Sequence, residues 1–177
     1  AAVNLWAAQH FSKKLKTFVS GRKDVFTILD RDISTKDKTI WFHCASLGEF
    51  EQAVPIIEAT KKLFKSHKII ISFFSPAGYE IKKNSDIADC IVYLPLDTIS
   101  NAKIFISKAH PSLAIFVKYE FWPSYLFELK ENQIPTILVS GLFRANQSFF
   151  KPYGSFMRKA LLSFNHFFVQ DSNSKEL

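Results

Sequence analysis

Short apolar runs alternate with helical patterns along most of this chain. Six runs rich in β-branched or aromatic residues are typical of buried strands; they span residues 39–44, 68–74, 90–94, 112–119, 136–140 and 166–170. Between them, the pattern predicts helices over residues 50–64, 100–109, 123–132 and 151–163. Buried strands separated by helices predict an α/β fold, in which a parallel sheet is covered by helices on both faces.

The amino-terminal end has a different pattern. In residues 3–19 the apolar positions repeat every three or four residues, and the lysines lie mostly elsewhere. This spacing predicts an amphipathic helix that ends near Gly21. We therefore expect two parts, an amino-terminal helix within residues 1–20 and a domain over residues 21–177 on which it packs.

Two further segments bear on the boundaries of the domain. The polar stretch 30–38 predicts a loop. Near the other end, Asp171 is a candidate helix N-cap, and residues 174–177 resemble a helix that has just begun. Since a compact domain rarely ends at such a point, we expect a fragment of a longer protein.

Composition narrows the class of protein. A chain of 177 residues with 47% hydrophobic residues predicts one globular domain with a real core. No run of about 18 uncharged apolar residues and no secretory signal is present in the sequence. Cys44 and Cys90 lie far apart, which favours free thiols in a reducing compartment. The net charge of +7 either favours an anionic partner or reflects a lysine-rich surface.

The common nucleotide-binding and nucleophile motifs are absent from the sequence. There is no G-x-G-x-x-G fingerprint, no G-x-x-x-x-G-K-[ST] phosphate loop and no G-x-S-x-G elbow. The five histidines are scattered without the spacing of a zinc site. If the protein uses a nucleotide, we expect another domain to hold it.

The loop that follows the first predicted strand is the strongest candidate for chemistry. It reads Ala45-Ser46-Leu47-Gly48-Glu49. Ligands of α/β proteins bind at the carboxyl ends of the strands, and Gly48 would let the backbone approach one closely. Glu49 is either a catalytic base or a first-turn carboxylate, which stabilises a helix by about 0.3–1 kcal/mol. The residues alone leave both interpretations open.

Three further strand-end loops carry useful side chains. The turn Ser75–Gly78 either cradles a phosphate or sugar or is an ordinary loop. Glu120 and Trp122 together suit carbohydrate recognition, whereas a core Trp beside a solvated Glu is the alternative. Arg144 is a phosphate ligand or a surface residue. Glu49 and Glu120 end strands of one sheet, and two acids in one cleft suit glycosyl transfer.

Ordered motifs along the chain also resemble those of one enzyme family. Trp41–Glu49 is similar to W-x-H-x-x-S-x-G-E, and Ser75–Gly78 to a T-x-T-G turn. Tyr93–Asp97 matches Y-x-P-x-D, Glu120–Pro123 matches E-x-W-P, and Gly21–Lys23 also fits. These motifs resemble the bacterial Kdo transferases, which attach 3-deoxy-D-manno-octulosonic acid (Kdo) to lipid A in lipopolysaccharide synthesis. The resemblance covers nearly the whole chain.

The resemblance implies the amino-terminal, Rossmann-like, acceptor-binding half of a two-domain GT-B glycosyltransferase. It implies that Glu49 is the general base, which deprotonates a hydroxyl of the lipid A precursor (lipid IVA) for attack on CMP-Kdo, and that Glu120 stabilises the transition state. We expect the acceptor to be bound by His43, Ser46, Gly48, Ser75, Gly78, Trp122 and Arg144. No metal or cofactor is implied. CMP-Kdo would be bound mainly by a carboxyl-terminal domain absent from this chain, so the isolated chain is expected to be inactive.

The chain departs from the family pattern at two places. Where the family commonly has N-A-R-L-S, Arg144 lies two positions further along, and Lys118-Tyr119 replaces a more acidic or polar approach to Glu120. Two other functions stay open. One is a GT-B transferase with another sugar nucleotide and another lipid or glycan acceptor, and the other is a non-catalytic α/β module that binds anions or lipids.

The family resemblance also suggests a partner for the positive charge. Lys13, Lys14 and Lys16 could face a membrane surface, since lipid A is phosphorylated and lies in a membrane. We therefore expect membrane association at the cytoplasmic face of the inner membrane of a Gram-negative bacterium. Nucleic-acid binding is disfavoured because no basic-aromatic reader motif is present in the sequence.

Overall fold

The chain forms a six-stranded parallel sheet in the order β3-β2-β1-β4-β5-β6. The structure is a computed structural model that describes residues 20–118 and 121–177. Its strands are β1 (Lys38–Cys44), β2 (His67–Phe73), β3 (Cys90–Tyr93), β4 (Pro111–Val117), β5 (Thr136–Gly141) and β6 (His166–Val169). The order reverses between β1 and β4, which is the strand arrangement of the doubly wound dinucleotide-binding fold.

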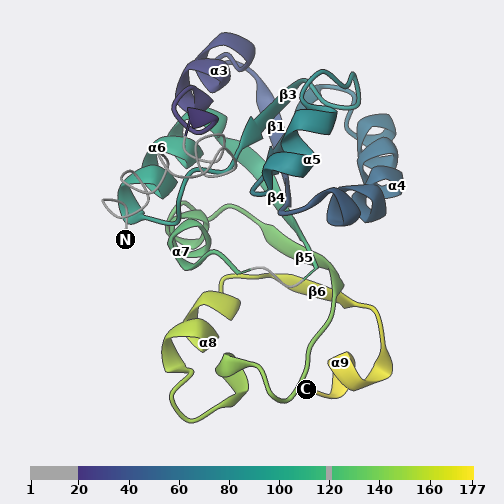
Figure 1. Cartoon of the computed structure of the whole chain (residues 1–177), viewed down its shortest axis with the longest axis vertical. Helices are drawn as coiled ribbons and strands as arrows, with labels where there is room; N and C mark the ends of the chain where they lie inside the picture. Colours follow the sequence, from purple (N-terminus) through teal and green to yellow (C-terminus); the bar gives the residue numbers. More distant parts are fainter. Residues whose placement is uncertain (1–19, 119–120) are drawn as a thin grey trace.

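Helices cover both faces of this sheet (Figure 1). The described helices are α3 (Val25–Asp32), α4 (Leu47–Leu63), α5 (Pro76–Lys82), α6 (Ile99–Ala109), α7 (Pro123–Glu131), η1 (Ser148–Phe150), α8 (Ser155–Leu161) and α9 (Ser172–Glu176). Side chains of α3, α6 and α7 share one buried cluster, whereas those of α4 lie in a second cluster across the sheet. The sheet therefore has a core on each side, as its continuous apolar strands require.

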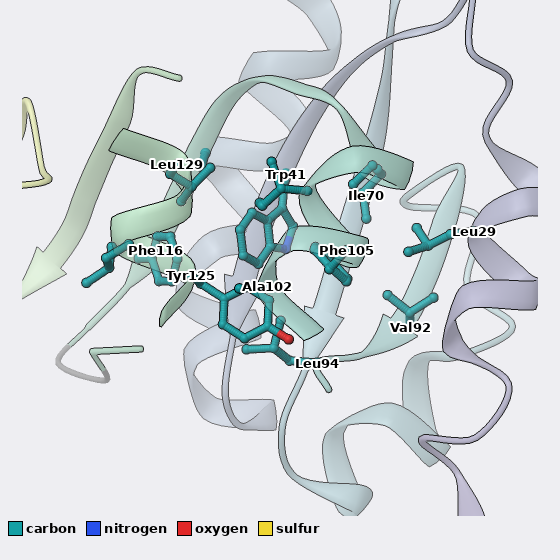
Figure 2. Packing of buried hydrophobic residues seen from close by; sticks show 14 of the residues in the cluster. Leu29, Trp41, Ile70, Val92, Leu94, Ala102, Phe105, Phe116, Tyr125 and Leu129 are labelled. Carbon is teal, nitrogen blue, oxygen red and sulfur yellow. The ribbon is translucent and has the colours of Figure 1, made fainter. Parts of the chain in front are cut away.

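Trp41 is at the centre of the larger core (Figure 2). Its fully buried ring lies 4.9 Å from Phe105 of α6, 5.2 Å from Phe116 of β4 and 5.9 Å from Tyr125 of α7, measured between ring centroids. The indole Nε1 donates a hydrogen bond of 2.8 Å to Ser72 Oγ on β2. Trp41 thus connects β1 to α6, β4 and α7 by packing, and to β2 by a hydrogen bond.

The predicted fold class is confirmed, and so are the six predicted strands, each to within a few residues at its ends. The carboxyl-terminal end also agrees with the prediction, because α9 begins where Asp171 Oδ1 accepts a hydrogen bond of 2.7 Å from Ser174 N. The predicted helix over residues 3–19 lies outside the described residues.

One helix was missed and two helix boundaries were predicted wrongly. No helix was predicted over residues 25–32 and the stretch 30–38 was assigned to a loop, but α3 forms there and continues to Asp32, because Val25 and Leu29 on its inner face are fully buried. α4 begins at Leu47 instead of residue 50 because Ser46 caps it. The helix predicted over residues 151–163 starts only after Gly154.

Gly154 explains that late start. A Cβ atom at this position would lie 2.1 Å from the Ser148 carbonyl oxygen. The chain therefore needs a glycine where it passes the η1 turn, and the residues before it form a separate turn closed by a hydrogen bond from Gly154 N to Lys151 O.

The edge strand β6 is more exposed than the other five. Like β3 at the opposite edge, it pairs with one described strand, but Phe167 and Phe168 are 41% and 58% exposed, whereas all four residues of β3 are buried. The sequence predicts the strand from its aromatic run, but the run does not reveal that much of this surface faces outward.

Replacing Trp41 with alanine should lower the free energy of unfolding by about 3–5 kcal/mol, because it empties the centre of the core and leaves Ser72 without its indole donor. Urea denaturation measures this change. Leu63→Ala is the control, since Leu63 is 78% exposed and its loss should change the stability by less than about 0.5 kcal/mol. Equal losses in the two variants would contradict the central role of Trp41.

Candidate active site

The candidate site lies at the edge of the sheet where β1, β2 and β4 end. In the parallel register His43 is paired with Ser72 of β2 and with Phe116 of β4. The loops that follow these three strands therefore begin side by side. A hydrogen bond of 2.7 Å from Ser75 N to Ala45 O ties the first loop to the second.

Ser46 and Glu49 form a capping box at the start of α4. Ser46 Oγ accepts a hydrogen bond of 3.4 Å from Glu49 N, and Glu49 Oε2 accepts one of 3.2 Å from Ser46 N. The Glu49 side chain is 5% exposed. The carboxylate expected from the sequence in the first helical turn is therefore present and held in a fixed orientation. Its role as a base stays a prediction.

Two glycines of the predicted acceptor set have opposite surroundings. Gly48 is exposed, and a Cβ atom there would meet no described atom within 4 Å. At buried Gly78 a Cβ atom would lie 2.6 Å from Phe73 Cδ1 and 3.1 Å from Leu47 N. Gly78 therefore lets α5 pack against the start of α4, whereas the surface at Gly48 is open to a ligand.

A short hydrogen-bond chain fixes the imidazole of His43. Ser72 Oγ accepts from Trp41 Nε1 and lies 2.8 Å from His43 Nδ1. Which of these two atoms donates depends on the tautomer of the imidazole, and His43 Nε2 has no partner among the described residues.

Burial keeps this imidazole neutral. His43 is 1% exposed, and desolvation lowers its pKa to about 3. His43 Nε2 and Trp122 Nε1 are both buried and have no hydrogen-bond partner among the described residues. The site thus contains one indole N–H group and one imidazole nitrogen whose hydrogen-bonding capacity the described residues leave unused.

Trp122, at the start of α7, packs against the ends of β1 and β2 through His43 and Phe74. Its ring lies 4.6 Å from Phe74 and meets His43 edge-on at 5.4 Å. The side chain is half-buried. Trp122 was predicted either to bind a carbohydrate or to be a core residue. The observed side chain packs against the core and is also partly exposed, so it fits neither prediction alone. Ser75, also half-buried, makes no capping hydrogen bond through its side chain.

The other predicted site residues are less closely joined to this cluster. Glu120 lies outside the described residues, just beyond Lys118, whose φ of 72° is left-handed. Arg144 is exposed in the loop after β5, two strands away from β1 in the sheet. Hydrogen bonds from Ser174 are the main cause that lowers the pKa of Asp171, and the charge of Arg144 lowers it further. The side chains of Arg144 and Asp171 therefore lie near each other.

Several residues that hold α7 at this edge of the sheet were not among the predicted site residues. Asp97 Oδ1 accepts a hydrogen bond of 3.0 Å from Ser124 N at the start of α7, and Tyr125 Oη donates one of 3.0 Å to Pro95 O. Burial is the main cause that raises the pKa of Asp97. The Y-x-P-x-D motif was the signal that could have identified this bridge, since its proline and acid are the two groups in contact with α7.

In the described part of the chain, no group of three or more His, Cys, Asp or Glu side chains could hold a metal ion. Cys44 and Cys90 are buried thiols, and burial is the main cause that raises the pKa of each, that of Cys90 to about 12. Within residues 20–118 and 121–177, no helix is long and apolar enough to cross a membrane.

Comparison with known protein families is decisive at this point. The family model of 3-deoxy-D-manno-octulosonic-acid transferase (kdotransferase) matches residues 17–177. The chain belongs to the Kdo transferase family. The resemblance drawn from the motifs around Glu49 is thereby confirmed at the level of the family.

Curated relatives agree with this family. A 3-deoxy-D-manno-octulosonic acid transferase of Aquifex aeolicus is 40% identical over 102 residues, which cover 57% of this chain and 27% of the relative. A transferase of the same name from Haemophilus influenzae is 29% identical over 62% of this chain and 26% of the relative. A bifunctional glycosyltransferase/methyltransferase of Fusobacterium nucleatum is 29% identical over 93% of this chain and 26% of the relative. These matches span about a quarter of the relatives' length.

A solved structure supports the fold of this Kdo transferase family member. A crystal structure from Listeria monocytogenes, described as a UDP-N-acetylglucosamine 2-epimerase, superposes with a TM-score of 0.56. The match covers 79% of this chain and 40% of that one, at 11% sequence identity. At this identity the likeness concerns the fold alone.

The two glycines give a matched test of the site's packing. Gly78→Ala should destabilise the protein by about 1–3 kcal/mol, because its Cβ atom would press on the Phe73 ring and the backbone of α4. Gly48→Ala should leave the stability unchanged or raise it by up to about 1 kcal/mol, since it adds a methyl group to an open helical position. Thermal unfolding of both variants measures the difference, and a harmless Gly78→Ala would refute the packing role.

The buried His43 should make stability depend on pH. Its pKa is about 3 in the folded state against an ordinary value of 6.5, so between these values only the unfolded chain binds this proton. Stability due to His43 is therefore complete above pH 6.5 and falls as the pH drops toward 3, by at most about 1.4 kcal/mol per pH unit. In urea titrations from pH 7 to pH 4, His43→Asn should lose stability less steeply than the wild type; parallel curves would contradict this.

Proposed function

We propose that this chain is the acceptor-binding, base-carrying amino-terminal half of an enzyme that transfers Kdo from CMP-Kdo to a lipid A precursor. Membership of the Kdo transferase family and the names of the Aquifex and Haemophilus relatives support this activity. The observation that carries the proposal is the orientation of Glu49, a nearly buried carboxylate held by the capping box at the carboxyl edge of the sheet.

In the proposed reaction Glu49 accepts the proton of an acceptor hydroxyl. The acceptor oxygen then forms a bond to the anomeric carbon of Kdo, while the bond from that carbon to the phosphate oxygen of CMP breaks and CMP leaves. Attack opposite the leaving group inverts the anomeric centre. Holding the carboxylate in one orientation favours this step, because a general base has to lie within hydrogen-bond reach of the proton that it removes.

The surroundings of Glu49 suggest how the acceptor is bound. The open surface at Gly48 admits a ligand next to the carboxylate, and the half-buried Trp122 offers an indole face beside it in the same set of loops. Ser46, Ser75 and His43 would contribute polar atoms, and Arg144 would meet a phosphate from the loop after β5. Glu120 would stabilise the transition state. Gly78 supports this surface through packing.

We further propose that a carboxyl-terminal domain binds CMP-Kdo and that the protein associates with the cytoplasmic face of the inner membrane. The absence of nucleotide-binding motifs from the sequence supports the first point. The net charge of +7, with Lys13, Lys14 and Lys16 in the predicted amino-terminal helix, supports the second, because anionic lipids attract basic segments.

A second candidate function is supported by the Fusobacterium relative. It matches 93% of this chain and is named a bifunctional glycosyltransferase/methyltransferase, without a stated sugar donor. A glycosyltransferase with a different sugar nucleotide and acceptor would use the same base and the same fold. Assays of the full-length protein with CMP-Kdo and with other sugar nucleotides distinguish the two functions.

Glu49→Gln should reduce Kdo transfer by the full-length protein about 10²-fold or more, since glutamine cannot take the hydroxyl proton. Glutamine can still complete a capping box, so the thermal midpoint should stay near that of the wild type. Initial rates with CMP-Kdo and a lipid A precursor measure the effect. Glu51→Gln is the control, because Glu51 lies on the same helix in an exposed ion pair with Lys82. Normal transfer by Glu49→Gln would exclude Glu49 as the base.

A further inference from the structure

Arg22 occupies an unusual position for an arginine. Its Nε donates a hydrogen bond of 3.0 Å to Leu94 O, and its Nη2 donates one of 2.6 Å to Phe74 O. The guanidinium group also lies 4.6 Å from the centre of the Phe74 ring and 4.9 Å from that of Tyr93. The side chain therefore bridges the ends of β2 and β3, since Phe74 and Leu94 are the residues that directly follow these two strands.

Both bridged residues lead directly into loops of the candidate site. Phe74 precedes Ser75, whose backbone N–H is bonded to Ala45 O in the loop of Glu49, and the Phe74 ring packs on Trp122. Leu94 precedes Pro95, whose carbonyl group accepts the hydrogen bond from Tyr125 Oη. Arg22 is thus one contact away from the loops that carry Ser75 and Trp122.

The Arg22 guanidinium keeps its charge although it is partly buried. Burial lowers the pKa of Arg22 to about 10, so the group is still charged at neutral pH although it is partly removed from water. The planar guanidinium can bridge two carbonyl oxygens and stack on aromatic rings at once, which a lysine ammonium cannot do. The two hydrogen bonds and two ring contacts of Arg22 therefore hold the residues that follow β2 and β3 in a defined arrangement.

We propose that Arg22 is a positioning residue of the acceptor site, which holds Phe74 and Leu94 so that the Ser75 loop and Trp122 take the arrangement that binds the acceptor. This inference rests on the proposed Kdo transfer but concerns the acceptor side alone. Gly21 adds to it, since a Cβ atom there would lie 2.3 Å from Tyr93 Cε2, so the chain passes tightly beside the ring on which Arg22 stacks.

The test compares Arg22→Lys with Arg31→Lys in the full-length protein. Arg31 is the matched control because it is exposed on α3 and pairs with Asp32. Arg22→Lys should raise the KM for the lipid A precursor about tenfold, the loss expected for one charge-assisted hydrogen bond, while the KM for CMP-Kdo stays within about twofold. Arg31→Lys should leave both constants unchanged.

A readout without turnover separates this inference from the proposed function. Labelling with 5-fluorotryptophan and assignment by Trp122→Phe gives a ¹⁹F resonance for Trp122, which Arg22→Lys should shift or broaden and Arg31→Lys should not. In Arg22→Ala, low millimolar guanidinium should restore the resonance and the acceptor KM, whereas urea at the same concentration should not.

The outcomes are distinguishable. An unchanged Trp122 resonance together with an unchanged acceptor KM in Arg22→Lys would overturn the positioning role. So would a fall in kcat that follows the loss of folded protein while both KM values stay constant, since that is the signature of a merely structural residue. If the wild type transferred no Kdo, the proposed function would fail, and the ¹⁹F resonance would still decide the role of Arg22.

Discussion

The parallel pairing of β1 with β2 on one side and β4 on the other is the constraint on which the candidate site depends. Parallel strands bring their carboxyl ends to one edge, so loops distant in sequence begin next to one another. The same register sets His43 beside Ser72, which allows one hydroxyl group to serve Trp41 and His43 together. The core and the site are therefore joined through a single hydrogen-bond chain.

Much of the fold could be predicted from the sequence, because buried parallel strands appear as continuous apolar runs. The helix α3 was missed because only Val25 and Leu29 of its eight residues are buried, which is too few to give a clear helical pattern in the sequence. The strand order could not be derived from local patterns. The order depends on pairings between strands that lie far apart in the sequence. For example, β1 pairs with β4, although residues 45–110 lie between these two strands.

The site was predictable at the level of motifs and much less at the level of roles. Glu49 and its capping partner follow from local sequence, whereas the hydrogen-bond chain does not, since Ser72 looks like an ordinary polar interruption of an apolar strand. Gly48 and Gly78 both lie in loops or first helical turns after a strand, so the sequence does not distinguish them. In the structure a Cβ atom at Gly48 would meet no described atom, whereas one at Gly78 would collide with Phe73. Only the packing of α5 against α4 distinguishes them. The partners of Arg22 are backbone carbonyl groups, which no side-chain motif reveals.

The edge strand β6 has a practical consequence for work with this chain. Beyond β6, no further described strand takes up the backbone N–H and C=O groups of its outer side, and two exposed phenylalanines lie along it. Such an edge is a template for strand addition by another molecule. This chain would therefore tend to aggregate through β6, and a charged substitution at Phe168 offers a way to keep it monomeric.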